Sequence, residues 1–392
     1  MMRTERSMKI TSIDVFSCEG GWRTLNFVKV GTDEGITGYA ECNCVRSEAI
    51  LRAAITYLGS LVMGRNPFQT EKIQFDLYRA TQRQLGGAAH QAISAIDAAL
   101  LDIKGKALGV PVYELFGGAF QTRIRTYYTH CGRAEPQNPE VPPVKSPADI
   151  PACAAYVKSL GFRDVKVNYP LTPEDRGDIT PGTLGKIVEW IGAWQEVLGP
   201  ECSIALDVAF AFKMAGISKL AKALEPFNML WLEAETLDPQ ALKSVRESTS
   251  TPICIGESLY RTQGFKPYLE EHALDIIMPD TVWNGITMGK KVADYANTYD
   301  ILFAPHNSHG VLGGLQAAHL CATCENFKIL EYEHDDVPWR NDIVTDPIAI
   351  EDGCIELSDR PGFGCDIVEE RIAEHPPKTG TSTLARAMGQ TR

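Results

Sequence analysis

The 392-residue sequence contains no apolar run of the roughly 18 residues that a membrane-spanning helix needs. It also lacks an excess of basic residues, since 38 lysines and arginines stand against 50 aspartates and glutamates, for a net charge of −12. Surfaces that bind nucleic acid or anionic membranes need a basic face, so we expect neither partner. The polar start, Met1 to Ser7, lacks the apolar centre of a signal peptide, and we therefore expect a cytoplasmic protein.

Cysteines in the spacing of a zinc finger or a disulfide framework are also missing. The sequence has 11 cysteines, but they are scattered, with close pairs only at Cys42/Cys44 and Cys321/Cys324. The second pair is a CxxC motif near His319, which could indicate metal binding or redox chemistry. No second CxxC follows, and the stretch is apolar and rich in alanine, so we interpret the pair as reduced and packed in the core.

Two hydrophobic patterns divide the chain. Residues 8–45 alternate as strands do, and helical periodicity follows as far as residue 108, which indicates an α+β unit. From residue 124, short apolar runs alternate with helical stretches, the pattern of repeated βα units. Eight such runs favour a closed barrel of parallel strands that are buried on both faces. The runs begin at Ile124, Val165, Ile204, Met229, Ile253, Leu274, Ile301 and Ile329.

Polar residues end six of these runs, and they recur with the period of the βα unit. Successive members are 26, 24, 23, 26 and 25 positions apart: Asp207, Glu233, Glu257, Asp280, His306 and Glu331. The carboxyl ends of barrel strands surround one mouth, so these residues should converge on a single site. Carboxylates that lie close together resist ionisation unless a cation separates them, and three from adjacent strands suit Mg²⁺.

Other candidate catalytic residues are expected beside this set. Lys166 and Asn168 alternate along one strand, so both should point into the mouth. A lysine in an apolar strand is costly unless it pairs with an anion or acts as a base. Asp280 and His306 end neighbouring strands, and a hydrogen bond between them would make His306 a general acid/base. His309, three residues further on, could compete for this role.

The order lysine, aspartate, glutamate, glutamate, aspartate, histidine, glutamate resembles that of the mandelate racemase subgroup of the enolase superfamily. Supporting segments are 95–106, 109–118, Gly256-Glu257-Ser258 and Met278-Pro279-Asp280, and the likeness spans residues 8 to 370 or so. The resemblance implies that Asp207, Glu233 and Glu257 bind Mg²⁺. It also implies that Asp280 and His306 form a catalytic dyad and that Glu331 interacts with the substrate or its enediolate.

The resemblance further implies the fold. We predict an α/β protein with an α+β capping domain over residues 1–123 and a modified TIM barrel, (β/α)₇β, over residues 124–335. Residues 336–375 are expected to return to the cap. The polar residues 376–392 are expected to form a disordered tail.

Three departures from the family pattern bear on the reaction. Asn168 replaces the usual second lysine of its strand, and the segment Leu232-Glu233-Ala234-Glu235 makes Glu235 a weaker rival ligand. Asp207-Val208-Ala209 lacks the histidine that some acid-sugar dehydratases carry two residues after the metal aspartate. This last departure argues against the commonest galactonate and mannonate dehydratase patterns.

The leading interpretation is a Mg²⁺-dependent dehydratase of an aldonate or aldarate, which removes the proton next to a carboxylate and expels the β-hydroxyl to give a 2-keto-3-deoxy acid. Lys166 would neutralise the carboxylate or act as the base. We expect substrate contacts from Asn168, His130, Arg23 and Arg83, although His130 could equally be a solvated loop residue. A racemase or epimerase is the alternative, and a non-catalytic sugar-acid-binding barrel is a remote one. We expect a homo-oligomer between a dimer and an octamer.

Overall fold

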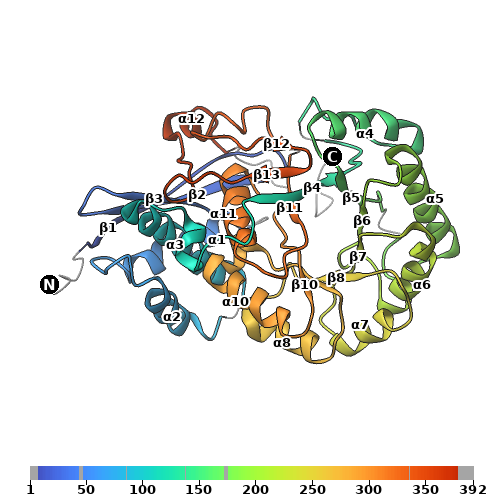
Figure 1. Cartoon of the computed structure of the whole chain (residues 1–392), viewed down its shortest axis with the longest axis horizontal. Helices are drawn as coiled ribbons and strands as arrows, with labels where there is room; N and C mark the ends of the chain where they lie inside the picture. The colour runs from blue at the N-terminus through green and yellow to red at the C-terminus, as the bar shows by residue number, and fades with distance from the viewer. Residues whose placement is uncertain are drawn as a thin grey trace.

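The computed structural model describes residues 8–43, 47–84, 86–136, 138–171, 175–334 and 336–377 (Figure 1). Of the expected tail, residues 378–392 lie outside the described residues. None of the described helices has the length and apolarity needed to cross a membrane.

The N-terminal part is an antiparallel sheet covered by helices. Its strands pair in the order β1-β2-β3, and its third helix packs against both β3 and the first helix. That third helix is rich in alanine and isoleucine, so it can be buried along nearly its whole length, and it ends at Gly109, whose φ of 72° favours glycine. The elements are β1 (Ile10–Glu19), β2 (Thr24–Thr32), β3 (Thr37–Glu41), α1 (Glu48–Ser60), α2 (Thr70–Thr81), α3 (Gly87–Leu108) and the short η1 (Val112–Phe116).

A ring of eight parallel strands follows within the described residues. β4 pairs with both β5 and β11, and a bridge between Phe303 and Phe327 links β10 to the segment before β11, which closes the ring. The strands are β4 (Arg123–Cys131), β5 (Asp164–Asn168), β6 (Ile204–Asp207), β7 (Trp231–Glu233), β8 (Ile253–Ile255), β9 (Ile276–Ile277), β10 (Leu302–Phe303) and β11 (Leu330–Tyr332). Each coincides with one of the eight apolar runs.

Helices connect these strands and lie around the outside of the ring, as Figure 1 shows for α4 to α8. They are η2 (Pro147–Asp149), α4 (Ile150–Ser159), α5 (Pro181–Leu198), α6 (Met214–Leu224), η4 (Glu225–Phe227), α7 (Pro239–Arg246), α8 (Arg261–Glu270), α9 (Thr281–Asn284), α10 (Ile286–Asn297) and α11 (Val311–Ala322). The predicted modified TIM barrel with an α+β cap is therefore confirmed.

The core of the barrel is filled by side chains from alternate strand positions, and it includes Tyr127, Trp231 and Met278. The outer core lies between the strands and the helices and contains Cys321 and Cys324. Cys321 and Cys324 are both buried and unbridged, and Cys324 Sγ donates to the Leu320 carbonyl at 3.2 Å. This is the packing expected of a reduced pair.

The C-terminal segment contacts the barrel before it reaches the cap. β12 (Ile350–Glu351) and β13 (Cys354–Glu356) form an antiparallel hairpin, and β13 pairs with the start of β4. The chain then runs to α12 (Glu369–Glu374), which lies beside the cap strands in Figure 1. Glu369 accepts hydrogen bonds there from Lys29 Nζ at 2.6 Å and from the Tyr39 hydroxyl at 2.8 Å.

Two buried carboxylates join the cap to the barrel. Glu41 at the end of β3 accepts the backbone N–H groups of Gly310 and Gly313 at 2.6 and 2.8 Å, and so caps the positive end of α11. A Cβ at Gly310 would lie 2.9 Å from both Glu41 carboxylate oxygens, so only glycine permits this approach. Asp97 of α3 accepts the backbone N–H and the hydroxyl of Thr287 on α10. These contacts fix the cap over the mouth of the barrel.

Candidate active site

Lys166 lies at the centre of a buried acidic cluster. Its ammonium is 2.9 Å from Glu233 Oε2 and 2.8 Å from Glu331 Oε1, and the three side chains are at most 2% exposed. Burial opposes the charge, but Glu233 and Glu331 outweigh it and hold the pKa of Lys166 well above its ordinary value. Lys166 is therefore a fixed cation, and this favours charge neutralisation over the role of base.

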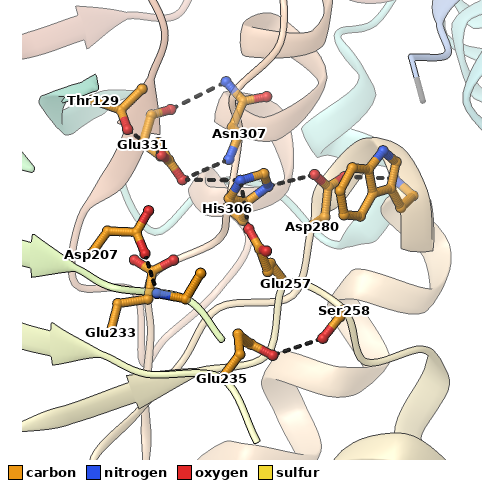
Figure 2. A network of polar contacts seen from close by, with 12 residues as sticks. Thr129, Asp207, Glu233, Glu235, Glu257, Ser258, Asp280, His306, Asn307 and Glu331 are labelled. Atoms are coloured by element: carbon orange, nitrogen blue, oxygen red, sulfur yellow. Dashed lines mark hydrogen bonds and ion pairs between the residues drawn. The ribbon is translucent and has the colours of Figure 1, made fainter. Parts of the chain in front are cut away.

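Asn168 and Asp207 lie opposite each other where β5 and β6 end. The Asn168 amide donates to Asp207 Oδ2 at 3.3 Å, and the backbone N–H of Ala209 donates to Asp207 Oδ1 at 2.8 Å. Ala209 has a φ of 41°, so the chain turns sharply after the strand and brings its N–H back to the carboxylate. Asp207 is thus oriented from both sides. Figure 2 shows it beside Glu233.

His306 connects the acidic cluster to Asp280 (Figure 2). Its Nδ1 is 2.6 Å from Asp280 Oδ2, while its Nε2 is 3.1 Å from Glu257 Oε2 and 3.9 Å from Glu331 Oε2. Burial lowers the pKa of His306, but Glu331, Glu257 and Asp280 outweigh it and raise the pKa to about 10. Asp280 therefore fixes Nδ1 of the ring, and Nε2 points toward the acidic cluster, where it can accept or donate a proton.

Asp280 binds two histidines. His309 Nε2 lies 2.8 Å from the same Oδ2 atom that contacts His306. Burial raises the pKa of Asp280, but His309 and His306 outweigh this effect and lower it to about 2. The backbone N–H of Trp283 donates to Asp280 Oδ1 at 2.6 Å. The expected dyad is therefore part of a triad, because His309 shares the carboxylate rather than competing for the place of His306.

Glu331, which lies beside Lys166 and His306, is held in place by neighbouring residues. It contacts the Thr129 hydroxyl, and its Oε2 accepts the backbone N–H of Asn307 at 3.1 Å. The Asn307 amide donates to the Glu331 carbonyl at 3.1 Å, which locks the end of β11 to the loop that carries His306 (Figure 2). Burial raises the pKa of Glu331, but Lys166 and His306 lower it to about 2. The carboxylate is therefore ionised and immobile.

The oxygen-rich side of the site suits a hard divalent cation. Burial and then Asp207 raise the pKa of Glu233 well above its ordinary value. Burial also raises the pKa of Glu257, to about 7, and Asp207 contributes. Asn168 Oδ1 is buried without a hydrogen-bond partner. These carboxylates lie close together, and all of them offer oxygen atoms as ligands. Mg²⁺ prefers oxygen ligands and would offset the repulsion between the carboxylates.

Two rival ligand assignments fit less well. Glu235 accepts hydrogen bonds from the Gly256 N–H at 2.6 Å and the Ser258 hydroxyl at 2.7 Å (Figure 2). Both of its carboxylate oxygens therefore bind the loop after β8. In the described part of the chain, Asp280, His306 and His309 are the group whose ligand atoms all lie within 4.8 Å of one another. Their proximity comes from the two hydrogen bonds to Asp280, and their nitrogen atoms are poor ligands for Mg²⁺.

The residues expected to contact the substrate from the cap are arranged differently from the prediction. Arg23 is buried, and its Nη1 lies 2.7 Å from Asp336 Oδ1, so its charge is already neutralised. Arg83 is exposed on the turn after α2 and forms no ion pair within the described residues. The structure thus does not bring either cation to the cluster around Lys166.

His130 lies between the end of β4 and the cap. Its Nδ1 is 2.5 Å from Glu333 Oε2, and its ring meets the edge of Trp22 at a centroid distance of 5.5 Å. Its φ of 54° shows that the strand bends at this residue. The side chain is 19% exposed, so the structure favours a held imidazole over a solvated loop histidine.

Several residues that contact the site residues were not predicted from the sequence. Glu333 lies two residues after Glu331, just past the end of β11, so the two-residue alternation of a strand could have found it. Thr129 and Asn307 each adjoin a predicted site residue, but neither type signals a role by itself. Asp336 is separated from its partner Arg23 by more than 300 positions, and no local pattern connects them.

Comparisons with known proteins agree with this architecture. Residues 16–117 match the family model of the mandelate racemase / muconate lactonizing enzyme N-terminal domain, and residues 150–371 match the enolase C-terminal domain-like model. The chain is 29% identical to the D-xylonate dehydratase of Haloferax volcanii, covering 94% of this chain and 89% of that protein. It is 32% identical to the D-galactonate dehydratase of Variovorax paradoxus, covering 94% and 96% respectively.

A solved structure from Burkholderia xenovorans, of a “putative L-alanine-DL-glutamate epimerase” bound to magnesium and fumarate, superimposes with a TM-score of 0.91. It is 32% identical, and the match covers 97% of this chain and 99% of that one. A mandelate racemase/muconate lactonizing enzyme-like protein from Rubrobacter xylanophilus has a TM-score of 0.87 at 31% identity, covering 95% and 98%. The chain is an enzyme that belongs to the mandelate racemase subgroup of the enolase superfamily.

Proposed function

We propose that this enzyme is a Mg²⁺-dependent acid-sugar dehydratase. The observation that carries the proposal is the position of His306, whose Nδ1 is held by Asp280 and whose Nε2 faces Glu257 and Glu331. The names of the relatives, a D-xylonate and a D-galactonate dehydratase, support the substrate class. The expected cation ligands are Asp207, Glu233 and Glu257. When bound, Mg²⁺ would hold the substrate carboxylate and stabilise the negative charge that develops on it.

The residues of this chain carry out the proton transfers. Nearby carboxylates raise the pKa of His306 to about 10, so His306 must lose its proton before it can act as a base, and a divalent cation bound to Glu257 would favour that loss. The neutral imidazole then accepts through Nε2 the proton on the carbon next to the substrate carboxylate. Asp280 keeps Nδ1 protonated and stabilises the imidazolium that results. The imidazolium then gives its proton to the departing β-hydroxyl, so the C–O bond breaks and water leaves. The remaining enol tautomerises to the 2-keto-3-deoxy acid. Lys166 remains charged and compensates for Glu233 and Glu331.

A racemase or epimerase would need a second acid/base on the opposite face of the planar intermediate. Lys166 is held as an ammonium between two carboxylates, and Asn168 cannot abstract a proton at any accessible pH. The epimerase name attached to the Burkholderia xenovorans structure makes this the alternative to test. A non-catalytic barrel would have little use for an oriented imidazole beside a cation site.

Charge balance under the cap favours an aldonate over an aldarate. A second substrate carboxylate would need a spare cation, and the two buried arginines there, Arg23 and Arg340, already face two buried carboxylates, Asp336 and Glu333. The side chains of Arg23 and Asp336 are 1% and 0% exposed. The expected substrate therefore has one carboxylate and a hydroxylated tail, and we propose that the imidazole of His130, held through Nδ1 by Glu333, contacts that tail.

The experiment is a screen of matched aldonates and aldarates with Mg²⁺, in which the 2-keto-3-deoxy product is detected. We expect turnover of at least one aldonate, no turnover by the chelated enzyme and none by His306→Asn. The Asp336→Asn variant frees the charge of Arg23, so it should raise kcat/KM for aldarates relative to the matching aldonates. Failure of all the acids to yield a keto acid would contradict the proposed function.

A further inference from the structure

A cavity of about 440 Å³ opens at the floor of the barrel, at the opposite end from the candidate active site. Its lining comes from the residues that precede or begin neighbouring strands, such as Leu230 before β7, Pro252 before β8 and Lys328 before β11. The volume is within the roughly 300–1,000 Å³ of ordinary small-molecule sites. None of the residues that we assign to the active site lines it.

Lys328 gives this cavity an uncompensated positive charge. The residue is half-buried, and within the described residues its ammonium forms no ion pair or hydrogen bond. Burial, with a contribution from Arg125, lowers the pKa of Lys328 below its ordinary value. A partly buried cation without a counter-ion loses hydration that nothing in the protein replaces.

The neighbouring charges are already matched with each other. Arg246 Nε donates to Asp275 Oδ1 at 2.8 Å, and Asp275 Oδ2 accepts the N–H of Ile253 at 2.9 Å. Arg125 is bound to Asp164 at 2.8 Å. Neither carboxylate is therefore available to Lys328. Among the residues that line the cavity, Arg246 and Lys328 are cationic and Asp275 is anionic, so the lining carries one excess positive charge; Glu225, which accepts the Ser250 N–H at 3.0 Å, lies outside the lining.

Two other residues that line the cavity, Arg246 and Ser250, carry further hydrogen-bond donors. Arg246 uses Nε for Asp275 and Nη1 for the His272 carbonyl at 3.1 Å, which leaves Nη2 unused within the described residues. Ser250, which is exposed, also lines the cavity, and its hydroxyl has no partner within the described residues. An ammonium, a guanidinium N–H₂ and a hydroxyl around one space form a donor set without a matching acceptor.

We propose that this cavity binds a small oxyanion, a carboxylate or a phosphate, with Lys328 as its counter-ion. Arg246 Nη2 and the Ser250 hydroxyl supply the additional hydrogen bonds. The site is separate from the chemistry at the other end of the barrel, so the inference does not depend on the proposed function. Because the anion would contact residues that precede β7, β8 and β11, its binding should stabilise the folded barrel.

The test is calorimetric titration of the full-length, chelator-treated protein with inorganic phosphate and, separately, with acetate. Chelation prevents magnesium phosphate complexes from forming. We expect saturable binding at one site and a rise in Tm as the anion concentration increases. Tighter binding of phosphate would identify a phosphorylated ligand, whereas equal or tighter binding of acetate would identify a carboxylate, and both outcomes support an oxyanion site.

Lys328→Met should weaken binding at least tenfold, and Lys328→Arg should retain it. The matched control is Lys222→Met, because Lys222 is an exposed lysine in the last turn of α6, outside the cavity. This control should bind as the wild type does. Both Lys328 variants should keep the wild-type kcat, since Lys328 lies away from the active site.

Two results would overturn the proposal. One is the absence of saturable binding of both phosphate and acetate by the wild-type protein, a result that needs no variant to fold. The other is binding by Lys328→Met, or by Lys328→Gln if the methionine variant does not fold, with the affinity of the wild type.

Discussion

Replacing Lys166 with methionine should destabilise the protein strongly, although methionine is nearly as long as lysine. The substitution removes the one ammonium that lies within 2.9 Å of Glu233 and 2.8 Å of Glu331. Removing one partner of a buried ion pair costs about 3–5 kcal/mol, because the other charge remains buried without compensation. Since one cation here serves two carboxylates, we expect a loss of about 5 kcal/mol.

The assay is urea denaturation of the chelator-treated protein at neutral pH. Lys219→Met is the control, because its ammonium is 3.9 Å from Asp178 and both side chains are more than half exposed, so no measurable loss is expected. Adding Glu331→Gln to Lys166→Met removes one uncompensated charge and should restore part of the stability. A free energy of unfolding for Lys166→Met within about 1 kcal/mol of the wild type would refute the reasoning, since that is the effect of an ordinary substitution.

The remaining predictions concern the histidine triad and one buried carboxylate of the cap. His306→Asn should abolish dehydration, with a loss beyond the roughly 10²–10⁴-fold typical of one acid/base if the imidazole serves both steps; wild-type kcat would disprove the assignment. Asp280→Asn and His309→Asn should reduce kcat less, because the His306 imidazole remains. Burial raises the pKa of Asp97 from 3.8 to about 6, so the wild type should lose stability relative to Asp97→Asn as the pH rises from 4 to 7. The difference should approach about 3 kcal/mol in unfolding experiments, and parallel pH profiles would contradict it.

The barrel and the principal site residues could be predicted because both depend on local, periodic features. A parallel strand that is buried on both faces leaves an apolar run, and its carboxyl end carries the functional side chain. Asp207, Glu233 and His306 each end such a run, so the βα period alone was enough to predict that they meet at one mouth of the barrel. Lys166 could be identified because burying an ammonium in an apolar strand is costly unless an anion lies beside it.

The rest depends on contacts that no local pattern contains. The pairing of Arg23 with Asp336 joins a cap loop to the C-terminal segment, and it turned an expected substrate contact into an internal ion pair. His309 was treated as a rival of His306, because spacing along a loop does not show that both rings reach the same oxygen of Asp280. Loop geometry and long-range charge pairing had to come from the structure.

Turnover of an aldonate with Mg²⁺ in D₂O, followed by NMR of both product and unreacted substrate, tests the central claim most directly. His306 is the one oriented acid/base in this account, with Lys166 fixed as a cation and Asn168 unable to take a proton. We expect a 2-keto-3-deoxy acid as the product, and recovered substrate that keeps its configuration at the carbon next to the carboxylate. Deuterium in recovered substrate with inverted configuration, without formation of the keto acid, would contradict it and would establish an epimerase with a second working base.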